Sequence, residues 1–192
     1  MTIQPRQHDA HHDLTWLIGA LARALFVRLD GGGQPLTALR RLAACDFSAP
    51  PRQVTHAIAP ACRWLPEALA AALLTAEEVA MALAAAHEHL CWRQAPEAAP
   101  AKAAASTAVL GMDAPLPWAD GSLRMLLTAP QARLPFCASS TTLLLTLSGE
   151  AAFRDAHGAL RHAPAGELAM LPAETHLMSV ARAPLLAALL HT

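Results

Sequence analysis

The sequence predicts an α+β protein in which an all-helical N-terminal extension precedes an antiparallel β-barrel. Leucines recur at intervals of three and four residues through the first half, which is typical of helices with one apolar face. Residues 141–190 contain short apolar runs separated by glycine and proline turns, a pattern typical of a small barrel or sandwich. An alanine- and proline-rich segment lies between the two halves. We therefore expect a helical extension over residues 1–93, a linker over 94–106 and a barrel over 107–192.

The composition indicates a globular protein with an ample core. The chain has 192 residues, of which 54% are hydrophobic and 15% charged, and its net charge of −1 provides no basic field for nucleic acid. Its longest apolar stretch near the start, residues 14–27, is interrupted by Arg23 and is too short to span a bilayer. We expect no nucleic-acid partner and no membrane partner. The four cysteines are scattered and form no CxxC pair, which favours reduced thiols and a cytoplasmic location.

Three helices are predicted before residue 75. The leucine stripe over residues 14–29 predicts the first helix, and the glycines of residues 30–33 end it. A second helix is expected over residues 36–44. Pro66 suits the first turn of a third helix, whose leucines over residues 65–73 share one face.

A fourth helix is predicted from a capping box. Thr75 and Glu78 have the spacing in which the threonine oxygen accepts from the backbone and the carboxylate reaches back. We therefore expect this helix to begin at about Ala76 and to end at about Arg93.

Short strands are predicted after the linker. Residues 107–112 and the alternating run over 122–129 come first, followed by the apolar runs 143–147, 151–153, 167–171 and 185–190. The residues expected to set the turns of the barrel are Gly149, Gly158, Pro164, Gly166 and Pro172.

Several histidines are better explained by structure than by chemistry. His8, His11 and His12 lie in a polar leader, where solvated side chains are the simplest interpretation. His87 and His89 resemble a chelating pair, but on the fourth helix they would point about 200° apart and could not share a metal.

Cys137 and His176 are the remaining candidates. A thiol nucleophile built on Cys137 would need His176 beside it in the fold. His176 follows Pro172 at a position where a turn leads into a strand. Two interpretations stay open, a metal ligand and a histidine hydrogen-bonded to the backbone.

The order Gly158-x5-Pro164-x-Gly166, followed by Pro172-x3-His176, resembles the second motif of the cupin barrels. Most of the chain resembles the cupin-type dimethylsulfoniopropionate (DMSP) lyases. This resemblance implies a cupin-like, RmlC-like jelly-roll barrel after the helical extension. The segments that carry the resemblance are 59–69, 90–93, 108–111, 123–130, 145–149, 175–178 and 183–187.

The resemblance also implies a divalent metal, which would be zinc, iron or manganese. Family members bind it through two histidines and a glutamate from one segment and a later histidine. The first segment reads Leu134–Leu143 here, and all three of its ligands are replaced, so that His176 is the only matching ligand position. Depending on the register, the replacing residues are Phe136 or Cys137, Ala138 or Ser139, and Thr141 or Thr142.

The reaction implied by the resemblance is a β-elimination that yields dimethyl sulfide and acrylate. Its base in the family is usually a tyrosine, which would fall near Leu143–Leu144, but this chain contains no tyrosine. One neutral imidazole does not hold a divalent metal, since such sites need three or four protein ligands. The leading hypothesis is therefore a divergent DMSP lyase-like cupin with a degenerate metal site, with weak or no lyase activity and with no cofactor if the site is lost.

Such a protein could still bind a small organic molecule. The side chains expected to line its pocket are Phe136, Cys137, Ser139, Thr142, Leu144 and Met178. The catalytic residues stay unassigned, and a homodimer is expected by analogy with other cupins.

Two alternatives stay open. An active metal-dependent carbon–sulfur lyase would use non-standard ligands around His176, with candidates at Glu150, Glu167, Glu174 and His162. A cysteine-dependent enzyme would instead pair Cys137 with His176 and would show a reactive thiol of low pKa.

Overall fold

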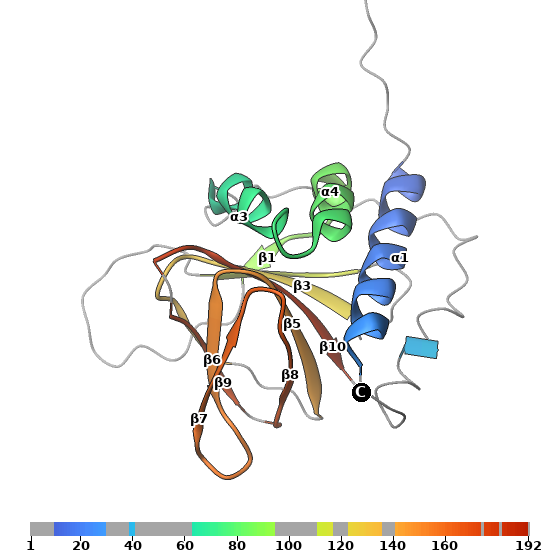
Figure 1. Ribbon diagram of the computed structural model, residues 1–192. Coiled ribbons are helices and arrows are strands. Elements are labelled where there is room, and N and C mark those ends of the chain that lie inside the picture. The colour runs from blue at the N-terminus through green and yellow to red at the C-terminus, as the bar shows by residue number, and fades with distance from the viewer. Residues whose placement is uncertain are drawn as a thin grey trace, which may run out of the picture.

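Helices cover one face of a β-sheet whose other face packs against a second sheet (Figure 1). The helices are α1 (Ala10–Arg28), α3 (Leu65–Ala72), α4 (Glu77–Ala86) and the 3-10 helix η2 (His87–His89). None of the described helices has the length and apolar character needed to cross a membrane. The structure is a computed structural model that describes residues 10–29, 39–40, 63–94, 111–116, 123–135, 141–173, 175–180 and 182–191.

The described strands form two antiparallel sheets, one of six strands and one of four. The larger sheet has the order β1-β2-β3-β10-β5-β8 and the smaller one the order β4-β9-β6-β7. Two facing sheets in which neighbouring strands are distant in sequence are the arrangement of a jelly roll, which the family resemblance implies. The strands are β1 (Arg93–Gln94), β2 (Gly111–Pro115), β3 (Leu123–Thr128), β4 (Arg133–Pro135), β5 (Thr142–Ser148), β6 (Glu150–Arg154), β7 (Leu160–Pro164), β8 (Leu168–Leu171), β9 (His176–Ser179) and β10 (Leu185–His191).

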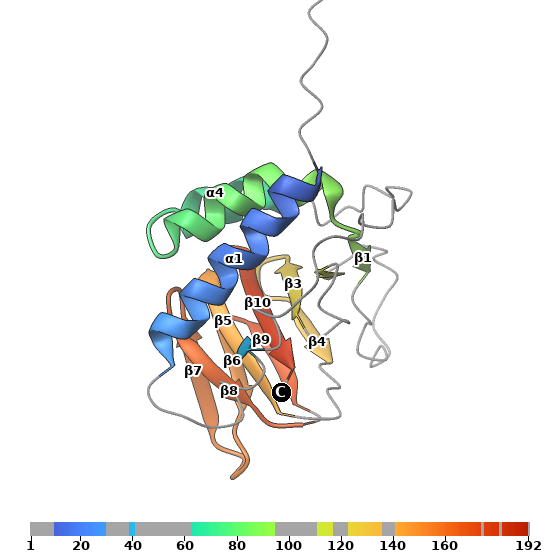
Figure 2. The same cartoon turned by 90° about the vertical axis from the view of Figure 1, so that its right-hand side faces the viewer.

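The six-stranded sheet separates two apolar cores. Because side chains alternate along a strand, Leu186 and Leu190 of β10 face the helices, whereas Leu185 and Leu189 face the second sheet. The helical core includes the leucine stripe of α1, whose members Leu14, Leu17, Leu21 and Leu25 are fully buried as the sequence predicts, while Leu29, just beyond the helix, is partly buried. Figure 2 shows α1 and α4 packed together over this sheet. The second core, between the two sheets, is the interior of the barrel.

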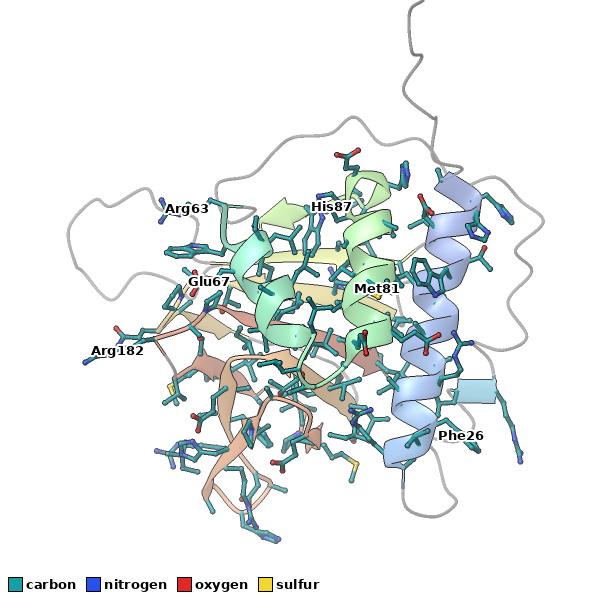
Figure 3. All side chains as sticks on the ribbon, turned by 45° about the horizontal axis from the view of Figure 1, so that its top comes forward. Phe26, Arg63, Glu67, Met81, His87 and Arg182 are labelled. Carbon is teal, nitrogen blue, oxygen red and sulfur yellow. The ribbon has the colours of Figure 1, made fainter. Side chains whose placement is uncertain are left out.

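The outer surface of the helical layer carries isolated apolar side chains. Phe26 of α1 and Met81 of α4, labelled in Figure 3, are exposed, and so is Leu74 in the turn between α3 and α4.

Three predicted glycine turns are present in the barrel. Gly149, Gly158 and Gly166 have φ angles of 72°, 78° and 90°, a backbone region that other residues enter at a cost. At Gly149 a Cβ atom would also lie 2.6 Å from the carbonyl oxygen of Pro184, so this turn has no room for a side chain.

The helical layer is tied to the barrel by hydrogen bonds. The Arg28 guanidinium at the end of α1 donates from Nε to the carbonyl of Gly166 (2.9 Å) and from Nη2 to the carbonyl of Thr75 (3.2 Å). The Thr75 hydroxyl donates to the carbonyl of Leu147 on β5 (2.6 Å). The turn between α3 and α4 is therefore fixed to both α1 and the sheet.

The predicted capping box at the start of α4 is wrong. The helix begins at Glu77 with Ala76 as its N-cap residue, and no side chain caps it. The hydroxyl of Thr75 bonds to β5 instead, while the Glu78 carboxylate pairs with Arg23 of α1. Tertiary contacts therefore replace the local ones.

Other local predictions also need correction. The fourth helix ends at Ala86, earlier than expected, and Arg93 lies in β1. Strand β7 was not predicted as an apolar run, because it lies at a sheet edge with most of its side chains exposed. Of the expected second helix, Leu39 and Arg40 are described and are helical, and the linker over residues 95–106 lies outside the described residues.

Candidate functional site

The interior of the barrel is the place where the resemblance puts a metal site, and its described side chains are mainly apolar. The inter-sheet core combines leucines of β3, β5, β8 and β10 with Phe153 of β6 and Leu177 of β9. Leu144 is fully buried in this core and pairs in register with Leu189. The inward position of β5 near which the resemblance implies a tyrosine thus carries an aliphatic side chain.

The expected pocket residues separate into three groups. Thr142 and Leu144 are fully buried, and both lie on the inward face of β5. Met178 of β9 is partly buried on the other face of its strand. Phe136, Cys137 and Ser139 lie outside the described residues.

His176 is exposed on β9. Its neighbour Leu177 is 1% exposed and belongs to the inter-sheet core, so the alternation of side chains directs His176 to the outer face of the four-stranded sheet. If β9 were shifted by one residue in register, His176 would face the inter-sheet core and Leu177 would face outward. The sequence pattern alone does not decide between these two registers.

Two other candidate ligands from the sequence lie on the same outer face, whereas Glu167 is exposed between β7 and β8 and Glu174 lies outside the described residues. Nδ1 of His162 is 2.6 Å from a carboxylate oxygen of Glu150, and both side chains are partly exposed. These residues sit on β7 and β6, and Ala152 separates His162 from Met178 in the register. The His162–Glu150 pair and His176 therefore lie at different register positions of the four-stranded sheet.

The two histidines of η2, His87 and His89, make contacts with different partners. Nε2 of His89 lies 3.5 Å from a carboxylate oxygen of the buried Asp13, which links η2 to α1. His87 accepts at its backbone carbonyl a hydrogen bond from the indole of Trp92 (3.2 Å). The expectation that the two rings cannot share a metal assumed an α-helix through both residues, whereas they lie in the 3-10 helix η2, so it stays a prediction.

A polar cluster of Arg124, Thr142 and His191 lies at one end of the inter-sheet core. The cluster is formed by the start of β3, the start of β5 and the end of β10. Arg124 pairs in register with Leu189, and His191 pairs with Thr142. Their side chains share the inward face with the leucines of the core. Sequence reasoning identified Thr142 but missed Arg124 and His191.

Burial changes the electrostatics of the two basic side chains in this cluster. Burial, and then the nearby positive charge of Arg93, lower the pKa of Arg124. Burial, and then the charge of Arg124, lower the pKa of His191, which favours a neutral ring. Nδ1 of that ring is 2.8 Å from the hydroxyl oxygen of Thr142. Asp113 of β2 is the register partner of Arg93.

This donor set does not suit a divalent metal. A metal of the zinc, iron or manganese type needs three or more anionic or neutral nitrogen, oxygen or sulfur ligands. The cluster offers one imidazole and one neutral hydroxyl, with a guanidinium beside them that would repel the ion. In the part of the chain that the structure describes, no three His, Cys, Asp or Glu side chains are grouped so as to hold a metal.

The comparison with protein families gives one match. The sequence model of the dimethylsulfoniopropionate lyase family matches residues 36–187, a span that includes helices α3 and α4 and most of the barrel. None of the curated proteins matches this chain significantly.

Two solved structures have a similar fold. One comes from "Crystal structures of DMSP lyases RdDddP and RnDddQII"; it is 18% identical, with 95% of this chain and 93% of that chain covered and a TM-score of 0.58. The other is the DMSP lyase DddQ from Ruegeria pomeroyi DSS-3, also 18% identical, with 95% and 91% covered and a TM-score of 0.56. At this identity the likeness establishes the fold, a helical extension on a cupin-like barrel.

Proposed function

This chain belongs to the dimethylsulfoniopropionate lyase family, and from that premise we propose that it is a divergent member with a degenerate metal site. In this proposal its lyase activity is weak or absent, and the barrel binds a small organic ligand. The family reaction would require a bound metal and a base.

The observation that carries the proposal is the apolar character of two inward positions. Leu144 of β5 and Leu177 of β9 are buried between the sheets, and neither can ligate a metal or accept a proton. His176, which matches a ligand position by sequence, is exposed on the other face of β9. The chain contains no tyrosine to act as the base that the family usually employs.

The test combines metal analysis with an activity measurement. Purified protein is assayed for zinc, iron and manganese by mass spectrometry, and for acrylate release from DMSP with and without a chelator. We expect substoichiometric metal and no chelator-sensitive release. One metal ion per chain together with chelator-sensitive turnover would overturn the proposal.

The His176→Ala variant separates the proposal from its main alternative, an active carbon–sulfur lyase with non-standard ligands around this histidine. In our proposal the substitution changes neither metal content nor acrylate release. The alternative requires that both be abolished. His157→Ala is a matched control, because His157 is exposed in the turn between β6 and β7 and belongs to none of the candidate ligand sets.

A further inference from the structure

Two buried hydroxyl groups of the inter-sheet core have no hydrogen-bond partner among the residues that the structure describes. They are Oγ1 of Thr146 on β5 and Oγ of Ser179 on β9. Thr146 is 0% exposed and Ser179 is 4% exposed. A hydroxyl group buried without a partner is unfavourable, so native proteins nearly always pair it with a protein group or with an ordered water. We propose that Thr146 and Ser179 together bind one water molecule between the two sheets.

The strand patterns direct both hydroxyl groups into the space between the sheets. On β5, Leu145 and Leu147 belong to the helical core, so Thr146 between them faces the second sheet. On β9, Leu177 belongs to the inter-sheet core, and Ser179, two residues later, lies on the same inward face. The two hydroxyl groups therefore enter the same core from facing sheets.

Thr146 and Ser179 also lie at the same end of this core, where β5 turns into β6 at Gly149. Ser179 pairs in register with Ala151, the second residue after Gly149. Thr146 is the third residue before Gly149. Thr142, near which the resemblance implies a ligand glutamate, is four residues from Thr146, which is about 13 Å along an extended strand. The proposed water site is therefore distinct from the place at which the resemblance implies the metal.

The side chains beside the two hydroxyl groups are small. Ala187 of β10 is the register partner of Thr146, and Ala151 of β6 is the register partner of Ser179. Ala163 of β7 follows Ala151 in the same row. All three alanines are buried in the inter-sheet core, whose other buried members are leucines and one phenylalanine. Because alanine fills less volume than leucine, this is the end of the core at which a molecule as small as water fits.

An irregularity in the larger sheet lies next to Thr146. The register between β10 and β5 shifts at this point, which is typical of a β-bulge. The backbone N–H of Thr146 donates to the carbonyl of Glu167 (3.0 Å), and its carbonyl accepts from the N–H of Gly166 (2.7 Å). The carbonyl of Leu147 accepts from the hydroxyl of Thr75 (2.6 Å). These backbone groups therefore have protein partners, whereas the hydroxyl of Thr146 has none in the described part of the chain.

Water suits this site better than an ion does. A hydroxyl group both donates and accepts a hydrogen bond, so a water molecule between two of them can use both of its roles. The register partners of Thr146 and Ser179 are alanines, which carry no charge to balance an ion, and burying an unbalanced charge is very unfavourable. The water would link β5 to β9, and thus one sheet to the other, through hydrogen bonds.

Magnetic relaxation dispersion of the water oxygen resonance counts long-lived internal water molecules in the folded full-length protein, and it tests the site. We expect the double variant Thr146→Val, Ser179→Ala to hold one such water fewer than the wild type, because both partners are removed. Thr146→Ser, which keeps a hydroxyl group, should hold as many as the wild type. Circular dichroism checks that each variant folds. An equal count in the wild type and the double variant would overturn the proposal.

Thermal unfolding distinguishes a bound water from two dry hydroxyl groups. Thr146→Val and Ser179→Ala each leave the water with one partner fewer, and each should lower the Tm by about 2–4 °C in a chain of this size. The loss in the double variant should be smaller than the sum of the two, because the second substitution acts on a site that has already lost its water. A higher Tm in either single variant, which is the result expected of a dry hydroxyl group, would contradict the site, and so would additive losses.

Thr128→Val is the matched control. Thr128 is a buried strand threonine whose hydroxyl donates to the carbonyl of Ala129 (3.1 Å). Its substitution should leave the number of internal waters unchanged, and its effect on the Tm should add to that of Ser179→Ala. A water lost from Thr128→Val would contradict the assignment to Thr146 and Ser179. These measurements need neither metal nor substrate, so their outcome is independent of the proposed function.

Discussion

Nδ1 of His191 lies 2.8 Å from the hydroxyl oxygen of Thr142, which joins the last strand of the barrel to β5 across 49 residues of sequence. The threonine is fully buried and the histidine is half-buried, so the ring is held in a place where charging it is unfavourable. This single contact predicts a pH dependence of stability.

The folded protein should lose stability in mild acid because of His191. Its pKa in the folded state is lowered from 6.5, so below about pH 6.5 the unfolded chain binds a proton more readily than the folded one. The free energy of unfolding should therefore decrease as the pH falls from about 7 toward the lowered pKa. Urea unfolding at several pH values measures this decrease, which should be smaller in His191→Gln; identical slopes would contradict the prediction.

His176 and Leu177 are neighbours on opposite faces of β9, so substitutions at the two positions test the register of this strand. Leu177→Ala should lower the free energy of unfolding by about 2–5 kcal/mol, because it removes a buried side chain from the inter-sheet core. His176→Ala should change it by less than about 0.5 kcal/mol, since the side chain is exposed. Chemical denaturation checks both, and the reverse order of effects would show that the strand has the other register.

Gly149 and Gly158 differ in what surrounds them, although both have a positive φ. Gly158→Ala should lower the free energy of unfolding by about 1–2 kcal/mol from backbone strain alone, because no atom lies within 4 Å of its Cβ position. Gly149→Ala should cost more, because its Cβ would meet the backbone oxygen of Pro184. Thermal unfolding of the two variants compares them, and equal losses would argue against this close approach.

Arg28 should matter more for stability than Arg23 on the same helix. Arg28→Gln removes hydrogen bonds to the carbonyls of Gly166 and Thr75 and should cost about 1–3 kcal/mol. Arg23→Gln removes an exposed ion pair with Glu78 and should cost less than about 1 kcal/mol. Denaturant unfolding of both variants is the measurement, and a larger effect at Arg23 would contradict the role of Arg28.

Much of the fold was predictable from local patterns. The leucine stripe identified α1, and apolar runs between glycine turns identified β5, β6, β8 and β10. Edge strand β7 was missed because only Ala163 of its residues is buried, which leaves almost no apolar pattern to detect. The capping box failed because the Thr75 hydroxyl has a tertiary partner on β5, which a local motif does not reveal.

The site was less predictable than the fold. Arg124 and His191 are single polar residues in apolar strands 67 positions apart, and only the pairing of β3 with β10 makes them neighbours. An inward polar residue in an otherwise apolar strand is a usable signal, but its partners depend on strand order. The side on which His176 faces depends on a one-residue register, which local sequence does not decide.

The position of β10 has a consequence for the biosynthesis of the protein. This strand lies between β3 and β5 and joins them in the larger sheet. During translation, the sheet therefore cannot assemble before residues 185–191 have been made and released from the ribosome. Until then β5 and its leucines lack their central partner, so the nascent chain exposes apolar surface that is prone to aggregation.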